Sequence, residues 1–240
     1  MEVKLKFVGK CLLIEVKRKR ILVVGDLHLG YEEFLNRGGV FVTREMMREV
    51  IREIAEVFER VGNVDKIVLL GDVKHNFGRI VKQEWEDAGG LIDYLMEKAK
   101  EVIIIKGNHD KILEPIAEKK GIEVRDYFIF DEIAFLHGDR DFSEIHDRKI
   151  KYWVMGHGHP AVKLRERGGA KMEKYKCFLV GKFKGREIII LPSFFSGNEG
   201  SDPRENDLGL AWKFNLEKFN AGVVGERLKV LEFGLLGKLE

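Results

Sequence analysis

An α/β fold with two mixed β-sheets packed on one another is the architecture that the sequence predicts. In the first half of the chain, short apolar runs of strand length alternate with amphipathic helical patterns. In the second half, short strand patterns follow one another almost without helical periodicity. No linker rich in proline and serine, internal repeat or low-complexity tract interrupts the 240 residues, so we expect one domain spanning residues 1–240.

The chain is expected to begin with strands. Residues 3–16 alternate between polar and apolar side chains, which predicts one or two antiparallel strands. Lys17–Arg20 is a basic turn, for which a solvated hairpin tip is favoured over a contact with DNA. Ile21–Gly25 is a continuous apolar run, typical of a strand that is covered on both faces.

Two helices follow, separated by buried strands. Apolar residues recur at three- and four-residue steps over Thr43–Val61, so we expect an amphipathic helix with Thr43 as its N-cap and Gly62 just beyond its end. The same spacing predicts a second helix over Trp85–Met96. The resulting β-α-β-α-β order predicts a parallel sheet with helices packed on it. The buried strands beside the helices are expected at Ile67–Gly71 and Val102–Gly107.

The second half of the chain is expected to form a second sheet that packs on the first. Residues 198–207 are polar and contain glycine, which predicts a mobile loop. The strands expected here are Tyr127–Phe130, Ile133–His137, Lys151–Gly156, Cys177–Phe183, Glu187–Leu191, Leu208–Asn215 and Glu226–Phe233.

The composition excludes several classes of protein. A hydrophobic fraction of 45% excludes an intrinsically disordered chain. No apolar run approaches the ~18 residues of a membrane span, and residues 1–20 lack the apolar core of a signal peptide. Cys11 and Cys177 form neither a disulfide framework nor a zinc pattern. We therefore expect a soluble, cytoplasmic protein without a membrane partner.

The residue usage predicts a protein from a thermophile, with compositional drift as the alternative. Charged residues make up 34% of the chain, while Gln83 is its single glutamine and Thr43 its single threonine. Hyperthermophile proteins are enriched in Lys and Glu and avoid amide side chains. The formal net charge of +2 predicts no strong overall attraction to nucleic acid, although a local basic face stays compatible with it.

Aspartate, asparagine and histidine residues gather where the predicted strands end. Ligand sites in open α/β sheets lie at the carboxyl ends of the strands, so five strands would deliver these side chains to one edge. A glycine in or beside each motif would let the backbone turn tightly. The motifs are Gly25-Asp26-Leu27-His28, Gly71-Asp72-Val73-Lys74-His75, Gly107-Asn108-His109-Asp110, Leu136-His137-Gly138-Asp139 and Gly156-His157-Gly158-His159.

These residue types are ligands for divalent metal ions. Asp26 and His28 are two residues apart, so in an extended segment both would point the same way, and His157 and His159 repeat that spacing. About seven such ligands are too many for one ion, whereas two ions ~3.5–4 Å apart that share one carboxylate would use them all.

The motifs, in this order, resemble the calcineurin-like metallophosphoesterase superfamily over about residues 20–200. Within it, the chain is most similar to the small archaeal phosphoesterases related to the SbcD-type repair nucleases. It also resembles the DNA-ligase-associated metallophosphoesterases, through Asp26-Leu27-His28-Leu29-Gly30 followed by Tyr31. The resemblance implies a four-layer fold, a sandwich of two sheets flanked by helices.

The resemblance also implies a role for each motif residue. Asp72 would bridge the two metal ions, and His109 would bind the scissile phosphate and assist the leaving oxygen without being a ligand. Many phosphatases of the superfamily carry an aspartate at the position of His75. A histidine at this position is what the SbcD-type nucleases have, and it favours a phosphodiesterase. The remaining ligands would be Asp26, His28 and His159 for the first ion and Asn108, His137 and His157 for the second.

The function expected is a phosphodiesterase or nuclease that hydrolyses P–O bonds with a metal-bridging hydroxide. Mn²⁺ is the expected cofactor, with Fe, Ni or Zn as alternatives, and DNA or RNA is the expected class of substrate. A small-molecule or nucleotide phosphoesterase is the alternative. A non-catalytic metal-binding subunit of a DNA-repair complex is disfavoured, because the ligand set and His109 are intact. A homodimer is compatible with the sequence.

Several other polar residues have less specific readings. The basic stretch 163–176 follows His159 and is either a solvated loop or a contact for substrate. His146 belongs to no motif and is expected at the surface. Asp110 and Asp139 are expected to cap turns or to brace the ligands.

Overall fold

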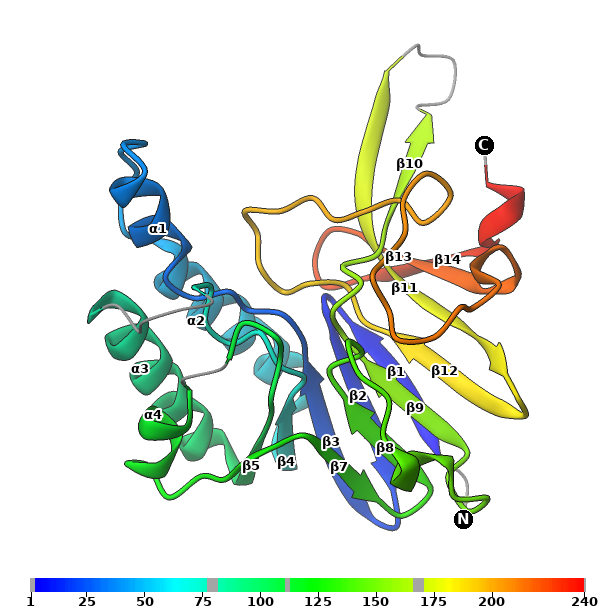
Figure 1. The fold of residues 1–240 in the computed structure, drawn as a ribbon, viewed down its shortest axis with the longest axis horizontal. Coiled ribbons are helices and arrows are strands. Elements are labelled where there is room, and N and C mark those ends of the chain that lie inside the picture. The colour runs from blue at the N-terminus through cyan, green and yellow to red at the C-terminus, as the bar shows by residue number, and fades with distance from the viewer. Residues whose placement is uncertain (1–2, 77–81, 111–112, 166–170, 240) are drawn as a thin grey trace.

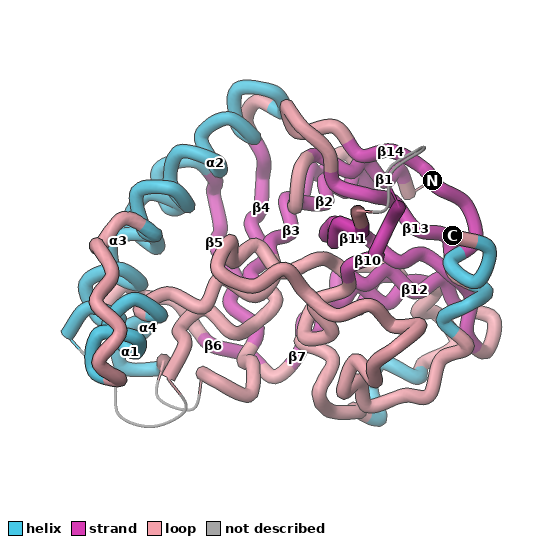
Figure 2. The backbone as a smooth tube through the Cα atoms, turned by 90° about the horizontal axis from the view of Figure 1, so that it is seen from above, coloured by secondary structure: helices cyan, strands magenta, loops and turns pink. Residues whose placement is uncertain are grey.

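The computed structural model describes residues 3–76, 82–110, 113–165 and 171–239. Two β-sheets lie face to face, and the α-helices cover the outer side of the first sheet (Figures 1 and 2). The expected two-sheet α/β sandwich with flanking helices is therefore confirmed. None of the described helices is long and apolar enough to cross a bilayer.

The first sheet has the strand order β1-β2-β3-β4-β5-β6 within the described residues. Strands β1 to β3 are antiparallel neighbours, and β3 to β6 run parallel, as the sequence predicts for both parts. The strands are β1 Lys4–Val8, β2 Cys11–Val16, β3 Lys19–Val24, β4 Val64–Leu69, β5 Ala99–Ile105 and β6 Val124–Arg125.

The second sheet has the order β14-β13-β11-β12-β9-β8-β7 in the described part of the chain, and β10 pairs with β11. Strands β8, β9 and β12 are parallel neighbours, whereas the other pairs are antiparallel. The strands are β7 Tyr127–Phe130, β8 Ile133–Leu136, β9 Tyr152–Met155, β10 Ala161–Arg165, β11 Met172–Phe183, β12 Arg186–Ile190, β13 Asn220–Val224 and β14 Val230–Leu235.

The helices lie on the side of the first sheet that faces away from the second (Figure 2). In α2, every third or fourth residue is buried, which is the amphipathic stripe that the sequence predicts. The helix α1 has only seven residues, too few for its periodicity to be recognised. The helices are α1 Tyr31–Arg37, α2 Met46–Val61, α3 Lys82–Lys98 and α4 Glu114–Glu118.

The expected N-cap at Thr43 is wrong. Helix α2 begins at Met46, and the side chain that accepts its first N–H groups is the buried Glu32 of α1. Glu32 Oε1 lies 2.6 Å from the nitrogen of Glu45 and 2.8 Å from that of Met46. A carboxylate from another helix therefore does what the sequence assigned to a local threonine.

The apolar core is layered in the same way as the backbone. One cluster fills the space between the helices and the first sheet, and a second, which includes Val23, Ile103, Phe135 and Ile189, lies between the two sheets. A third cluster, around Trp153, covers the outer face of the second sheet. Irregular chain and short 3₁₀ helices close this third cluster, and they form the outermost layer on that side.

The strand expected at Leu208–Asn215 is wrong, because this segment is irregular. Its alternating apolar residues fit a strand, but β12 and β13 already pair with the two edges of β11. Leu208 and Trp212 instead pack onto the outer core cluster. The strand expected at Glu226–Phe233 is β14, displaced toward the C-terminus, and β13 was not expected.

Candidate active site

The carboxyl ends of three parallel strands of the first sheet and of two parallel strands of the second meet at one edge between the sheets. In the first sheet, Val24 of β3 is paired with Leu69 of β4, and Leu69 with Ile104 of β5. In the second sheet, Leu136 of β8 is paired with Met155 of β9. The structure brings together every residue of the predicted ligand set here: Asp26, His28, Asp72, Asn108, His137, His157 and His159.

Backbone hydrogen bonds continue the pairing of β3 and β4 beyond the ends of the strands. The nitrogen of Asp26 donates to the carbonyl of Gly71 at 3.3 Å, and that of His28 donates to the carbonyl of Asp72 at 2.8 Å. The nitrogen of Leu29 then donates to the carbonyl of Val73 at 2.9 Å. The two loops are therefore held together by their main chains, which fixes the positions of the side chains they carry.

The loop backbone is not extended at the clustered residues, contrary to the geometry expected for the Asp-x-His and His-x-His pairs. Asp26 has φ 51°, His28 φ 47° and Asp72 φ 47°, and His157 and His159 have φ 64° and 42°. These left-handed conformations are unfavourable for residues other than glycine and gather at functional sites. The side chains of each pair do converge, but through tight left-handed turns.

Two glycines allow the chain to approach the carboxylates closely. A Cβ atom on Gly107 would lie 2.2 Å from Oδ1 of Asp72, and one on Gly156 would lie 2.6 Å from Oδ2 of Asp26. The nitrogen of His157, next to Gly156, lies 3.1 Å from each of the two carboxylate oxygens of Asp26. The glycines of these motifs are therefore needed for the packing of the site.

The first donor group consists of Asp26, His28, Asp72 and His159, whose ligand atoms all lie within 4.8 Å of one another. Nε2 of His28 is 3.3 Å from Nε2 of His159 and 3.7 Å from Oδ2 of Asp72. Nε2 of His159 is 3.4 Å from Oδ1 of Asp26. Asp26, His28 and Asp72 are buried, so these polar atoms face one another away from bulk water.

The second donor group consists of Asp72, His137 and His157. Nε2 of His137 lies 3.1 Å from Nδ1 of His157 and 3.5 Å from Oδ2 of Asp72. It is also 3.0 Å from Oδ1 of Asn108, which joins this group. Nδ1 of His137 donates to the carbonyl of Leu70 at 2.7 Å, and this bond holds the ring with Nε2 facing the group.

Burial and the two carboxylates act on the histidines in opposite directions. Burial lowers the pKa of His28 to about 3, which keeps that imidazole neutral. Burial would also lower the pKa of His137, but contact with Asp72 and the charge of Asp26 raise it to about 10. Burial raises the pKa of Asp72, yet His137 and His28 hold it below its ordinary value. The site therefore combines buried anionic carboxylates with imidazole nitrogens, a setting that favours a cation.

The residues present fit divalent metal ions. Carboxylate oxygens, imidazole nitrogens and one amide oxygen converge in two groups that share Asp72, and these donor types suit Mn, Fe, Ni and Zn. In His28, Nε2 faces the first group, while Nδ1 is buried without a hydrogen-bond partner among the described residues. The described residues thus include two neighbouring groups of potential metal ligands that share one carboxylate.

His109 and His75 lie beside the first donor group. Nδ1 of His109 donates to the backbone carbonyl of His75, so Nε2 of His109 is directed to the site, 3.8 Å from Oδ2 of Asp72. A main-chain carbonyl therefore orients His109. A ring nitrogen of His75 lies within 4.8 Å of nitrogens of His28 and His109. Burial lowers the pKa of His75 to about 4, so that ring is neutral near pH 7.

The structure adds supporting residues that the sequence left undefined. Asp110 is fully buried and accepts hydrogen bonds from the nitrogens of Gly107 at 3.1 Å and of Val73 and Lys74 at 3.2 Å. It therefore ties the loop after β5 to the loop after β4, the bracing that was expected of it. On the other side, the hydroxyl of Ser193 donates to the carbonyl of Asp26 at 2.9 Å, which no motif indicated.

The basic stretch 163–176 is mainly a β-hairpin, and residues 166–170 lie outside the described part of the chain. Lys163 pairs with Glu205, and Lys171 with Glu173. Lys176 is not a surface cation, because Nζ donates to the carbonyls of Ser193, at 2.8 Å, and of Phe195. His146 is partly exposed and lies 2.7 Å from a carboxylate oxygen of Asp141.

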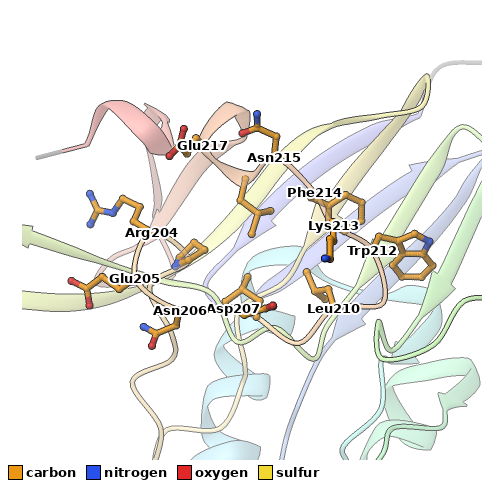
Figure 3. Close-up of a pocket in the computed structure, with 13 residues that line it drawn as sticks. Arg204, Glu205, Asn206, Asp207, Leu210, Trp212, Lys213, Phe214, Asn215 and Glu217 are labelled. Atoms are coloured by element: carbon orange, nitrogen blue, oxygen red, sulfur yellow. The ribbon is translucent and has the colours of Figure 1, made fainter.

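A groove lies near the second donor group, formed by the segment wrongly expected as a strand. It has a volume of about 810 Å³ and is lined by residues 203–208, Leu210 and residues 212–217, with Arg204 and Glu205 toward one end and Trp212 and Phe214 toward the other (Figure 3). A Cβ atom on Gly209 would lie 3.3 Å from Nε2 of His157. This segment therefore borders both the groove and the site.

Comparison with known proteins agrees with this geometry. The profile of the calcineurin-like phosphoesterase family matches residues 19–224. The crystal structure of a nuclease MPE from Pseudomonas putida has the same fold, with a TM-score of 0.60 and 16% identity over 96% of this chain and 100% of that chain. The phosphoesterase Yfce from E. coli superposes less well, with a TM-score of 0.42 and 14% identity over 90% of this chain and 98% of that one. No curated protein sequence matches the chain. The chain belongs to the calcineurin-like phosphoesterase family and is a metal-dependent phosphoesterase.

Proposed function

We propose that the protein is a phosphodiesterase or nuclease that uses two divalent metal ions, with Mn²⁺ as the first candidate. The observation that carries the proposal is the pair of donor groups that share Asp72. His109 lies beside the first donor group and is a member of neither. When bound, two divalent ions would offset the negative charge of the phosphate and lower the pKa of water toward ~7.

The ligands would divide between the two ions as the donor groups do. Asp26, His28 and His159 would hold the first ion, and Asn108, His137 and His157 the second. Asp72 would contact both, because it is the carboxylate common to the two groups. The left-handed loops and the buried Asp110 would keep these donors in place before the metals bind.

His109 would act on the phosphate and the leaving oxygen. Its Nδ1–H is directed to the carbonyl of His75, so Nε2 is the ring atom that faces the donor groups. When protonated, Nε2 can donate to a phosphate oxygen or to the departing alkoxide, which typically contributes 10²–10⁴-fold for a general acid.

The imidazole ring of His75 supports a preference of the enzyme for phosphodiester over phosphomonoester substrates. A carboxylate at this place would add negative charge beside a phosphate, whereas the neutral imidazole offers a second polar nitrogen near His109. The leaving group of a diester is a poor alkoxide, so it gains more from nearby donors. His75→Asp should therefore narrow or reverse the preference for diesters while both metals remain bound.

Hydrolysis of two nitrophenyl substrates tests the proposal. The purified protein would be assayed on bis-p-nitrophenyl phosphate and p-nitrophenyl phosphate with Mn²⁺, Fe²⁺, Ni²⁺ and Zn²⁺, and then on single- and double-stranded DNA and RNA. We expect turnover that depends on added metal, with the diester hydrolysed more efficiently than the monoester. A preference for the monoester, or an unchanged ratio in His75→Asp, would refute this account of His75.

We also propose a cytoplasmic location. It is supported by Cys11 and Cys177, which are both buried and free, as is usual in reducing compartments.

A further inference from the structure

Aromatic side chains extend the candidate active site beyond His109. The ring of His75 lies 5.6 Å from that of His109, and Tyr31 and Phe34 of α1 meet the His75 ring edge-on at 4.8 and 5.0 Å between centroids. Tyr31 is also 4.9 Å from the ring of Phe195, which in turn lies 5.6 Å from that of His28. We call Tyr31, Phe34 and His75 the aromatic wall.

The outer part of this wall is exposed although apolar. Phe34 is 49% exposed, and its ring is nearly parallel to that of Tyr31, at 23° and 6.1 Å between centroids. Phe195, which lies between Tyr31 of the wall and His28 of the first donor group, is 4% exposed. The wall therefore leads from a buried end at the donor groups to an open face on α1, so a ligand held at the donor groups can reach it.

The loop after α1 is tied by hydrogen bonds to the last turn of that helix. The side chain of Asn36 accepts from the nitrogen of Val42 at 2.9 Å and donates to its carbonyl at 3.2 Å, and the nitrogen of Val40 donates to the carbonyl of Leu35 at 2.9 Å. The loop presents Phe41, which is 90% exposed. Its backbone is thus fixed in a conformation that leaves apolar side chains in solvent, which points to a ligand for this side of the molecule.

We propose that the aromatic wall stacks the nucleobase next to the scissile phosphodiester, on the side of the leaving group. This rests on the proposed function, because it takes a nucleotide diester as the substrate. His109 would assist the leaving oxygen, and the wall continues from His109, so the nucleoside attached to that oxygen would meet the wall. Flat apolar rings bind any base by its π-face.

The stacked base would have to be unpaired. A base within a duplex already has both faces covered by its neighbours, so it can reach the wall only after leaving the stack. The substrate class inferred is therefore a single-stranded nucleic acid or an unpaired end. Base stacking on an aromatic side chain changes affinity by roughly 5- to 150-fold.

Dinucleotides with one base removed test the proposal. Wild type would be assayed with Mn²⁺ on thymidine dinucleotides that are intact, abasic in the 3′ nucleoside or abasic in the 5′ nucleoside, and the product phosphates identify which nucleoside leaves. We expect removal of the leaving-group base to lower kcat/KM by about 5- to 150-fold. Removal of the other base should have less effect.

Phe34→Ala should abolish this discrimination, bringing the ratio of intact to leaving-side abasic substrate close to 1, and Phe34→Trp should restore it. Phe233→Ala is the matched control, because Phe233 is 42% exposed on β14 in the second sheet. That variant should keep the wild-type ratio. Metal content and thermal unfolding would be measured for each variant.

Two results would overturn the proposal. One is a wild-type enzyme that hydrolyses the three dinucleotides equally well. The other is a Phe34→Ala variant that keeps the ratio of wild type, in which case the wall would serve another occupant, such as a protein. Failure of the proposed function looks different, because wild type would then hydrolyse neither bis-p-nitrophenyl phosphate nor any dinucleotide.

Discussion

Replacing Lys176 by methionine should change how the stability of the protein depends on pH. The Lys176 ammonium donates to two carbonyls of the segment that packs against the Asp26 loop. Burial, together with the nearby charge of Lys10, lowers its pKa to about 7 from the usual 10.5. Methionine keeps much of the length of the side chain but does not titrate.

The sign and size of the effect follow from these two pKa values. Between pH 7 and pH 10.5 the unfolded chain keeps the proton on Lys176 and the folded chain has lost it, so the free energy of unfolding rises with pH. The full difference between the two pKa values corresponds to about 5 kcal/mol. Below pH 7 Lys176 is charged in both the folded and the unfolded state, so burial of the charge lowers the free energy of unfolding by this full amount.

Urea unfolding of wild type and Lys176→Met at several pH values between 6.5 and 10 measures this. The free energy of unfolding of wild type minus that of the variant should rise by about 4 kcal/mol between pH 7 and pH 10. Lys4→Met is the control, because Lys4 is an exposed residue of β1. Parallel pH profiles for wild type and Lys176→Met would show that the buried lysine does not have a lowered pKa.

Three further predictions concern the candidate active site. Asp72→Asn should reduce the bound metal from two ions toward none and lower turnover more than Asp26→Ala, and a variant with two ions and full activity by mass spectrometry and assay would contradict the shared role. His109→Ala should keep both metals and lose roughly 10²–10⁴ in kcat, whereas loss of a metal would make it a ligand. Gly156→Ala should weaken metal binding in calorimetric titration, because its Cβ would lie 2.6 Å from Oδ2 of Asp26. Gly89→Ala should bind metal as wild type does, because among the described residues no atom outside the adjacent backbone of its own helix would lie within 4 Å of its Cβ.

The sequence predicted the clustered residues well, because each motif directly follows a buried strand whose direction the β-α-β order fixes. Once β3, β4 and β5 are parallel, Asp26, Asp72 and Asn108 must lie at one edge. The conformation there could not be predicted the same way. Local spacing treats Asp26-Leu27-His28 as extended, but the left-handed turns are imposed by hydrogen bonds to the loop after β4.

The other failures share a physical cause, namely contacts between segments distant in the sequence. Glu32 caps α2 in place of Thr43 because α1 folds back against the start of that helix. In the sequence, Lys176 is one cation of a basic stretch. In the structure it lies on β11, the strand that pairs with β10, and its side chain points into the interior. Residues 208–215 alternate like a strand, but Leu208 and Trp212 pack onto the outer core cluster, whose other members come from distant segments.

The left-handed backbone of the clustered residues sets a limit on how this protein can be stabilised. Each non-glycine residue in that conformation costs roughly 1–2 kcal/mol, so Asp26, His28, Asp72, His157 and His159 together hold conformational energy comparable to the net stability of a domain. Replacing any of these residues by glycine would relieve the backbone strain and remove a potential metal-ligand atom. Selection for thermal stability alone would therefore erode this edge of the sheets first, and these side chains persist only under selection for the chemistry that they perform.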